Sequence, residues 1–372
     1  MNGAAAAITP VATARAAFVG RFPAGPVGEV TAVDDLPGFA AAFGGGIETE
    51  ASLVVRQFYA NGGADARIVG VEDPDAAGLT AGIEALAATD FDVLCVPDAA
   101  GLPADATGSV HRAALARCRE TGAVLLIDPP PGVTDPGAAS TWAAGLVTST
   151  HAAAYFPRVR VADPGAPVGE RVIGPSGSVA GVYARTDREH GVWKAPAGTD
   201  AGLLGVTALE VAVDDRGAAV LGPLGVNTLR EFPGAGPVVW GARTRHGTAG
   251  TDPEYRYVPV RRFAIFLTKS IEAGLGWAVF EPNNEPLWAA VRGQVGSFLS
   301  GLFRAGAFPG ATEDECWFVR CGAQTMTGAD IAAGRLVVLV GFAPLQPAEF
   351  VLLRIEQESG RVRRTSGSHQ PL

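Results

Sequence analysis

Strand-like and helix-like segments alternate through the N-terminal half of this chain, and that alternation limits its fold more than any other feature of the sequence. Short apolar runs suit buried strands, and stretches with an apolar residue every three or four positions suit helices. The strand-like runs are residues 18–19, 66–71, 91–96, 124–127 and 156–161. The helix-like stretches are residues 34–43, 52–59, 79–86, 110–119 and 142–147. This order predicts the α/β (α+β) class, with some parallel pairing of strands.

The pattern changes near Leu224. Before it, residues 164–225 are rich in glycine and proline, so we expect irregular connections and short strands there. After it, the spacing of the apolar residues from Val260 to Ile271 predicts an amphipathic helix. Further strands are predicted at residues 238–242, 277–280, 317–319, 336–340 and 350–355.

The strongest helical signal follows Asn284, which suits the N-cap position of a helix. Apolar residues recur there in steps of three and four over several turns: Leu287, Trp288, Val291, Val295, Phe298, Leu299, Leu302 and Phe303. Gly293, Gly296 and Gly301 interrupt this helix, and each costs about 1 kcal/mol relative to alanine. They are either tolerated or allow another backbone, from the same chain or a partner, to approach closely.

Composition excludes several classes of protein. Hydrophobic residues make up 48% of the 372 residues and charged residues 18%, which suits a chain with a sizeable core. The net charge is −9, and without a visible basic face nucleic-acid binding is disfavoured. The first twenty or so residues lack the charged and apolar regions of a signal peptide. The longest apolar run, near residues 336–345, is far shorter than the roughly 18–20 residues that span a bilayer. We therefore expect cytoplasmic synthesis and no membrane insertion.

The sequence contains no convincing catalytic, metal or cofactor motif. There is no Walker motif and no GxGxxG after a strand, and GPSGS at residues 174–178 lacks the last glycine of a nucleophile elbow, so it suits a turn at a helix start. The five histidines are scattered: His111, His151, His190, His246 and His369. The four cysteines fit no zinc pattern and are expected to be reduced and buried: Cys95, Cys118, Cys316 and Cys321.

Two groups of polar residues leave an enzymatic alternative open. Acids at expected strand ends could line a site or only cap loops: Asp90, Asp92, Asp98 and Asp128. The loop at residues 281–286 holds two carboxylates and two amides, which suit either an acid–base pair or a turn into the next helix. We favour the structural interpretation in both cases, and expect no catalytic residue, metal or cofactor.

Several ordered motifs in the C-terminal third resemble the phage tail sheath family. They are GVNTLREFPG (225–234), VWGART (239–244), YRYVPVRR (255–262), FEPNNEPLW (280–288), QTMT (324–327) and PAEFV (347–351). Similar motifs lie nearer the N-terminus: AFVG (17–20), FGG (43–45), QFYANGG (57–63), GPSGSVAGVYA (174–184) and VWKAPAG (192–198). The short chain is most similar to the compact sheaths of extracellular contractile injection systems.

The resemblance implies a structural protein that polymerises with itself as six-fold rings stacked around an inner tube protein, between baseplate and cap proteins. Contraction of this sheath drives the tube through a target envelope, and the assembled particle can be released from the cell. The implied subunit has an N-terminal arm and the start of the inner domain at residues 1–25, and an outward α/β domain at 26–223. A conserved inner α/β domain at 224–357 ends in an arm strand at 348–357, and a flexible tail follows at 358–372. The helix bearing Trp288, Gly293, Gly296 and Gly301 is a candidate packing or inner-face helix.

Terminal arms exchanged as strands between subunits are also implied by the resemblance. At the C-terminal end, residues 348–357 suit such a strand, because one face is wholly apolar and needs a partner sheet. That partner belongs either to a neighbouring subunit or to the same chain; the candidate arm residues are Phe350, Val351, Leu352, Leu353, Arg354 and Ile355.

The N-terminal end departs from the family pattern. Residues 1–15 are rich in alanine and lack the alternation of a strand. We therefore expect either that the possible arm at Ala7, Ile8, Thr9 and Val11 is weak or degenerate, or that the given start is internal. A degenerate arm would suit a specialised sheath paralogue or a sheath-like cap near the baseplate. This remains the main alternative to the principal sheath subunit, beside an α/β enzyme.

Overall fold

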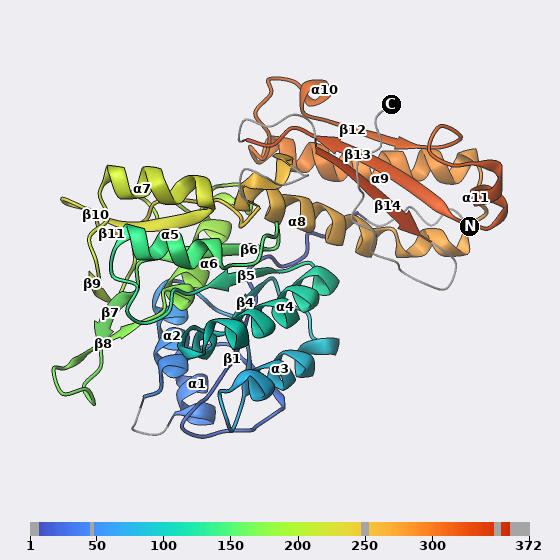
Figure 1. Cartoon of the computed structure of the whole chain (residues 1–372). Helices are drawn as coiled ribbons and strands as arrows, with labels where there is room; N and C mark the ends of the chain where they lie inside the picture. The colour runs from blue at the N-terminus through green and yellow to red at the C-terminus, as the bar shows by residue number, and fades with distance from the viewer. Residues whose placement is uncertain (1–6, 45–47, 247–252, 346–350, 358–372) are drawn as a thin grey trace. The chain divides into compact units, whose positions relative to one another are not determined.

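The structure is a computed structural model, and it describes residues 7–44, 48–246, 253–345 and 351–357 (Figure 1). The chain forms two compact units, a larger one of Ala12–Arg262 and a smaller one of Met1–Val11 with Phe263–Leu372. Helices and strands alternate along much of the larger unit, which confirms the predicted α/β class.

The larger unit is built on an eight-stranded sheet in the order β11-β10-β6-β5-β4-β1-β3-β2. The six inner strands are parallel, and β2 and β11 close the two edges by antiparallel pairing. The strands are β1 (Ala16–Gly20), β2 (Val30–Val33), β3 (Ala66–Gly70), β4 (Val93–Cys95), β5 (Val124–Ile127), β6 (Ala152–Phe156), β10 (Val226–Phe232) and β11 (Gly236–Val239). A second sheet has the order β8-β7-β9, formed by β7 (Val159–Ala162), β8 (Glu170–Ile173) and β9 (Val206–Leu209).

Helices cover both faces of the large sheet, which explains why its central strands are apolar at every position. One face packs against α2 and α6: Phe18 contacts Phe58 of α2, with ring centroids 5.3 Å apart, and Tyr155 is hydrogen-bonded to Tyr183 of α6. On the other face, Leu94 belongs to a hydrophobic core that it shares with residues of α3, α4 and α5. The helices are α1 (Leu36–Phe43), α2 (Glu50–Ala60), α3 (Ala76–Ala85), α4 (Ala104–Thr121), α5 (Pro136–Ala144), α6 (Ser176–His190) and α7 (Asp215–Leu221).

The prediction of irregular structure over residues 164–225 was wrong for two segments, because α6 and α7 lie there. The glycines of α6 favoured a loop in the sequence, but they allow α6 to approach α2 closely. An added Cβ at Gly177 would lie 1.9 Å from the carbonyl oxygen of Val54, and one at Gly181 would lie 2.5 Å from that of Phe58. Packing thus outweighs the low helix propensity of glycine.

The compact units do not follow the domain boundaries expected from the sequence. Residues 12–25 and 224–262 fall in the larger unit, because β1 is a central strand of the large sheet and β10 extends that sheet beside β6. Residues 7–11 group with the C-terminal unit. Which unit faces inward in an assembly stays a prediction.

The smaller unit packs helices against a three-stranded antiparallel sheet, β12-β13-β14. Its core contains Phe263, whose ring lies 5.6 Å from that of Phe308 and 5.2 Å from that of Phe342. Gly341 of β13 leaves room for the ring of Phe318 on β12, where an added Cβ would lie 2.2 Å from that ring. The elements are α8 (Val258–Gly274), which begins in the larger unit, α9 (Glu285–Arg304), α10 (Glu313–Cys316), α11 (Gly328–Ala332), β12 (Trp317–Cys321), β13 (Leu336–Phe342) and β14 (Val351–Gln357).

The strand predicted at residues 277–280 is instead a 3₁₀ helix, Gly276–Phe280, that directly follows α8. Val258–Phe280 is long and apolar enough to cross a bilayer by length and composition alone. Within this stretch, Phe263, Leu267 and Ile271 are buried in the protein core, so its apolar character has an explanation in the fold. The predicted helix after Asn284 is confirmed as α9, and the Asn284 side chain accepts a hydrogen bond from the Leu287 amide.

Candidate functional site

The acids at the strand ends hold loops and a helix start in place. Asp128, which follows β5, accepts hydrogen bonds from the Ser176 amide at 2.8 Å and the Ser176 hydroxyl at 2.6 Å. Burial raises the pKa of Asp128 from 3.8 to about 7, although these two bonds oppose the rise. Burial likewise raises the pKa of Asp98 to about 6, and Asp98 accepts the Arg21 amide at 2.7 Å. Ser176 is 1% exposed and begins α6, as predicted for the GPSGS turn.

The described residues hold no group of three or more histidine, cysteine or acidic side chains suited to a metal ion. All four cysteines are free and buried, as expected. His151 lies deep in the larger unit, where its Nδ1 is 2.7 Å from the Ala123 carbonyl oxygen and its Nε2 contacts Arg261. Burial and the Arg261 charge lower the pKa of His151 to about 3, so the ring is neutral at ordinary pH.

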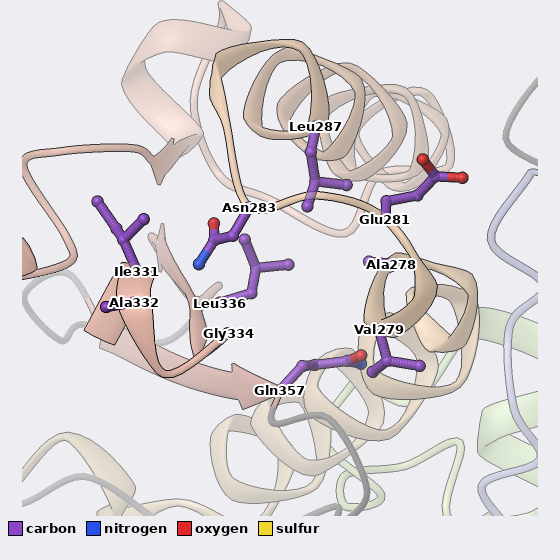
Figure 2. Close-up of a pocket in the computed structure, with 10 residues that line it drawn as sticks. All are labelled: Ala278, Val279, Glu281, Asn283, Leu287, Ile331, Ala332, Gly334, Leu336 and Gln357. Atoms are coloured by element: carbon purple, nitrogen blue, oxygen red, sulfur yellow. The ribbon is translucent and has the colours of Figure 1, made fainter. Parts of the chain in front are cut away.

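The loop at residues 281–286 turns the chain into α9. Asn283 accepts a hydrogen bond from the Trp288 indole at 2.6 Å and donates one to the Arg335 carbonyl at 3.0 Å. A pocket of about 150 Å³ lies beside it, lined mostly by apolar side chains such as Leu287 and Leu336 (Figure 2). Figure 2 shows the Glu281 carboxylate turned away from the centre of this pocket. The second carboxylate of the loop, Glu285, pairs with Arg292 at 2.7 Å.

The outer face of α9 offers a more extended feature, a groove of about 590 Å³. Small residues form its floor, and the N-terminal segment forms one side; the lining residues are Ala7, Ile8, Ala290, Gly293, Gln294, Ser297, Phe298 and Gly301. An added Cβ at Gly293 or Gly301 would meet nothing within 4 Å. At Gly296 it would lie 3.7 Å from Trp317 of the same chain. The three glycines thus divide into one internal contact and two that face the groove.

The C-terminal strand β14 pairs with β13 of its own chain. Ile355 lies opposite Val338, Leu353 lies opposite Val340, and Val351 lies opposite Phe342. This is the second of the two partners that the sequence left open. The predicted alternation is confirmed for the described part: Val351, Leu353 and Ile355 are buried, whereas Leu352 is 53% exposed and Arg354 faces outward. Among the residues that the structure describes, β14 is an edge strand, so one side of its backbone has no partner strand there. Residues 348–350, including Phe350, lie outside the described residues.

The N-terminal segment lies along α8 within the smaller unit. Ile8 is 7% exposed and packs on Gly274, where an added Cβ would come within 2.6 Å of the Ile8 side chain. The Val11 amide donates to the Ser270 hydroxyl at 3.2 Å. Ala7 and Thr9 are exposed, and none of these four candidate arm residues lies in a strand. The predicted lack of strand character is confirmed for residues 7–15.

Some surface residues that the structure draws attention to gave no signal in the sequence. Ala290 and Ser297 join the groove only because they share a helix face with Gly293 and Gly301. Phe280 is 88% exposed, although its place beside an apolar run favoured burial. The periodic spacing on α9 could have identified the groove residues, whereas the exposure of Phe280 follows only from the 3₁₀ turn.

Two family profiles match most of the chain from residue 72 onward. The phage tail sheath protein central domain matches residues 72–245, and the phage tail sheath C-terminal domain matches residues 250–358. Among curated proteins, the tail sheath protein of Vibrio phage KVP40 is 28% identical over 128 residues. That match spans 34% of this chain and only 19% of the length of the phage protein.

Solved structures of contractile particles resemble the chain over almost its full length. The contracted helical sheath of the anti-feeding prophage is 31% identical, with a TM-score of 0.78 over 96% of this chain and 97% of that chain. A chain in the six-fold symmetrised baseplate of the same prophage is also 31% identical, with a TM-score of 0.74 and the same coverage. The contracted sheath of the PVC extracellular contractile injection system is 29% identical, with a TM-score of 0.78 over 96% and 95% of the two chains.

Proposed function

This chain belongs to the phage tail sheath family, and from that premise we propose that it is the structural subunit of a contractile, phage-tail-like injection particle. Its copies stack as six-fold rings around an inner tube protein, between a baseplate and a cap. Contraction of the stack drives the tube through a target envelope. The particle assembles in the cytoplasm and is released from the cell.

The observation that carries this proposal is the match over 96% of the chain to a contracted helical sheath. A match of this extent leaves little of the chain for an unrelated activity, and the relatives are structural proteins rather than enzymes. Contraction without a nucleotide requires energy stored in the contacts between copies. Heterologous contacts that do not close generate open helical assemblies, which suits a stack of rings.

We assign two surfaces of the smaller unit to assembly. The groove on α9 is floored by Gly293, Ser297 and Gly301, and a floor of small residues lets a partner backbone approach closely. The inner tube protein is the proposed partner there. The second surface is β14, whose unpaired side and apolar face suit exchange between neighbouring copies by strand addition.

Strand exchange predicts that β14 leaves the β13 of its own chain and pairs with the β13 of a neighbour when sheaths form. Cysteines at Val340 and Leu353 would test this, because these residues lie directly opposite one another in the ladder. After oxidation, sheaths of Val340→Cys/Leu353→Cys should give covalent multimers on a denaturing gel, while the unassembled protein gives monomers.

A matched control uses Val319→Cys/Val340→Cys, which joins β12 to β13. These two strands are not exchanged, so this variant should stay monomeric on the gel in both states. Monomers only from assembled Val340→Cys/Leu353→Cys would refute strand exchange, while leaving the sheath function itself intact.

Electron microscopy of the purified protein, expressed alone and with its inner tube protein, tests the function. Striated tubes or stacked rings are expected. Discrete small particles at every concentration, with or without the tube protein, would count decisively against a sheath subunit.

A specialised copy near the baseplate is the second candidate function. It is favoured by the N-terminal segment, which forms no strand over residues 7–15, and by the match to a chain in a prophage baseplate. The number of copies per purified particle separates the candidates: a principal sheath subunit should be the most abundant chain, and a specialised copy should be limited to one or two rings.

A further inference from the structure

The chain passes between its two compact units at two places, between Val11 and Ala12 and between Arg262 and Phe263. The first passage lies in a segment without regular structure, residues 7–15. The second lies inside α8, which runs without a break from Val258 to Gly274. The chain therefore crosses between the units once in the irregular segment at residues 7–15, which we call the strap, and once within the continuous helix α8.

Thr13 lies near the first passage and Arg262 lies at the second, and a hydrogen bond joins these two residues of the larger unit. The Arg262 guanidinium donates to the carbonyl oxygen of Thr13 at 2.8 Å, although the two residues are 249 positions apart in the chain. The strap is thus tied to the first turns of α8 on the side of the larger unit.

Asp187 of α6 joins both residues to the body of the larger unit. Its carboxylate accepts two hydrogen bonds from Arg262, at 2.9 Å and 2.6 Å, and a third from the Thr13 hydroxyl at 2.6 Å. One turn earlier on α6, the ring of Tyr183 lies 4.6 Å from the Arg262 guanidinium, and its hydroxyl is bonded to Tyr155 of β6. The cluster therefore rests on a helix that packs on the central sheet.

The burial of this cluster makes it sensitive to the loss of any one member. The Arg262 and Asp187 side chains are 3% and 5% exposed, although a pocket of about 280 Å³ borders Thr13 and Asp187. The Asp187 carboxylate raises the pKa of Arg262 although burial opposes that rise, so the guanidinium stays charged. Removing one partner of a buried ion pair leaves the other charge without compensation, which is strongly unfavourable.

We propose that Asp187, Arg262 and Thr13 form a clamp that fixes both passages of the chain to α6. The strap and the first turns of α8 are therefore held together, and they loosen together when the clamp is broken. A force on the smaller unit then reaches the larger unit at α6 through both passages at once. In a contracting sheath this clamp would keep the two units coupled, a consequence that rests on the proposed function. The clamp itself is a property of the single chain and is testable without assembly.

Hydrogen–deuterium exchange of the unassembled full-length protein provides the test. In Asp187→Asn, amides at residues 12–16 and 258–263 should both exchange at least about tenfold faster, since one substitution unpairs a buried arginine that holds both. In Thr13→Val the ion pair remains, so faster exchange should be limited to residues 12–16.

Glu50→Gln is the matched control, because Glu50 pairs at 2.6 Å with another buried arginine of the same unit, Arg158, far from both passages in sequence. It should leave residues 12–16 and 258–263 unchanged. If Asp187→Asn loosens only one passage, or if Glu50→Gln loosens both equally, the clamp is refuted. If Asp187→Asn does not fold, unchanged exchange at residues 12–16 in Thr13→Val would refute the clamp instead.

Assembly separates this inference from the sheath function. Asp187→Asn subunits should still form tubes, because both assembly surfaces lie in the smaller unit, but the two units should lose their coupling on contraction. Wild-type protein that forms no tubes would refute the sheath function and leave the exchange result on the clamp standing.

Discussion

Glycines inside helices have opposite roles at two positions of this chain. Gly181 of α6 has the Phe58 carbonyl oxygen and the Asn61 Cβ within 2.5 Å of where its own Cβ would be. Gly293 of α9 has nothing within 4 Å. The same residue type therefore permits close helix packing in α6 and leaves a groove open in α9, a difference that only the surroundings decide.

Replacing each of these glycines with alanine should change stability in opposite directions. Gly293→Ala should stabilise the isolated chain by about 0.5–1 kcal/mol, because alanine has the higher helix propensity and meets no obstacle. Gly181→Ala should destabilise it by about 1–3 kcal/mol, because the added methyl group overpacks the contact with α2. Denaturant unfolding of both variants measures the two signs; equal signs would contradict the structure at one of the two sites.

Asp128 gives the larger unit a pH dependence with a defined sign. Because burial raises the pKa of this carboxyl group to about 7 in the folded chain, its contribution to stability is complete below the ordinary carboxyl pKa near 4. That contribution is lost as the pH rises through about 7, where the buried carboxylate forms.

Asp128→Asn should remove this dependence, since the amide mimics the protonated acid and can still accept the Ser176 amide. The variant should melt at least ~4 °C above the wild-type protein at pH 8, and the difference should shrink toward pH 4. Thermal melts at several pH values measure this. Because both proteins share His111 and His151, the difference between them cancels the titration of these histidines. A difference that is constant with pH would contradict the assignment.

At the scale of elements, β14 has one buried, apolar face and one exposed face. Val351, Leu353 and Ile355 are buried against the smaller unit, and Leu352 and Arg354 face outward. The alternation of β14 is visible in the sequence, but the sheet with which it pairs is not. In the single chain, β14 pairs with β13 of the same chain, so it contributes to the stability of the subunit before any assembly.

Adjacent serine substitutions should separate the two faces of β14. Leu353→Ser should destabilise the isolated chain by about 2 kcal/mol or more, because it places a hydroxyl in the core. Leu352→Ser should change stability by less than about 0.5 kcal/mol, since Leu352 is already half exposed. Thermal unfolding of both variants checks the register; a larger loss in Leu352→Ser than in Leu353→Ser would mean that the strand is shifted by one residue.

At the scale of the whole molecule, the larger unit contains all eight strands of the large sheet and a hydrophobic core whose residues range from Ala17 to Val226 in the sequence. β1 lies between β3 and β4 in the middle of this sheet, and β10 extends it beside β6. A boundary drawn from the sequence at residues 26 and 223 would remove both strands, and with them the centre of the sheet.

Two fragments should therefore behave differently. Residues 12–262 expressed alone should fold cooperatively, because they keep all eight strands of the sheet. Residues 26–223 should fail to fold or should aggregate, since losing β1 exposes unpaired edges of β3 and β4 in the core. Circular dichroism with thermal melting compares them. A cooperative transition in the shorter fragment would support the boundary expected from the sequence.

The sequence alone determined the features that depend on local spacing or on ordered motifs. The α/β class, α9 with its Asn284 cap, the buried face of β14 and the resemblance to tail sheaths all followed from it. These features depend on residues close together in the chain, or on short motifs that need no knowledge of their partners in space.

The tertiary structure decided which partner each apolar face meets. Periodicity shows that a face is buried but not against what, so the placement of β1 and β10 in one sheet and the pairing of β14 with β13 were not predictable. The start of α6 was predicted from the GPSGS turn, but its length was missed because glycine disfavours an isolated helix, whereas Gly177 and Gly181 here let α6 pack closely on α2. The bonds among Thr13, Asp187 and Arg262 join residues far apart in the chain, so only the folded backbone brings them together.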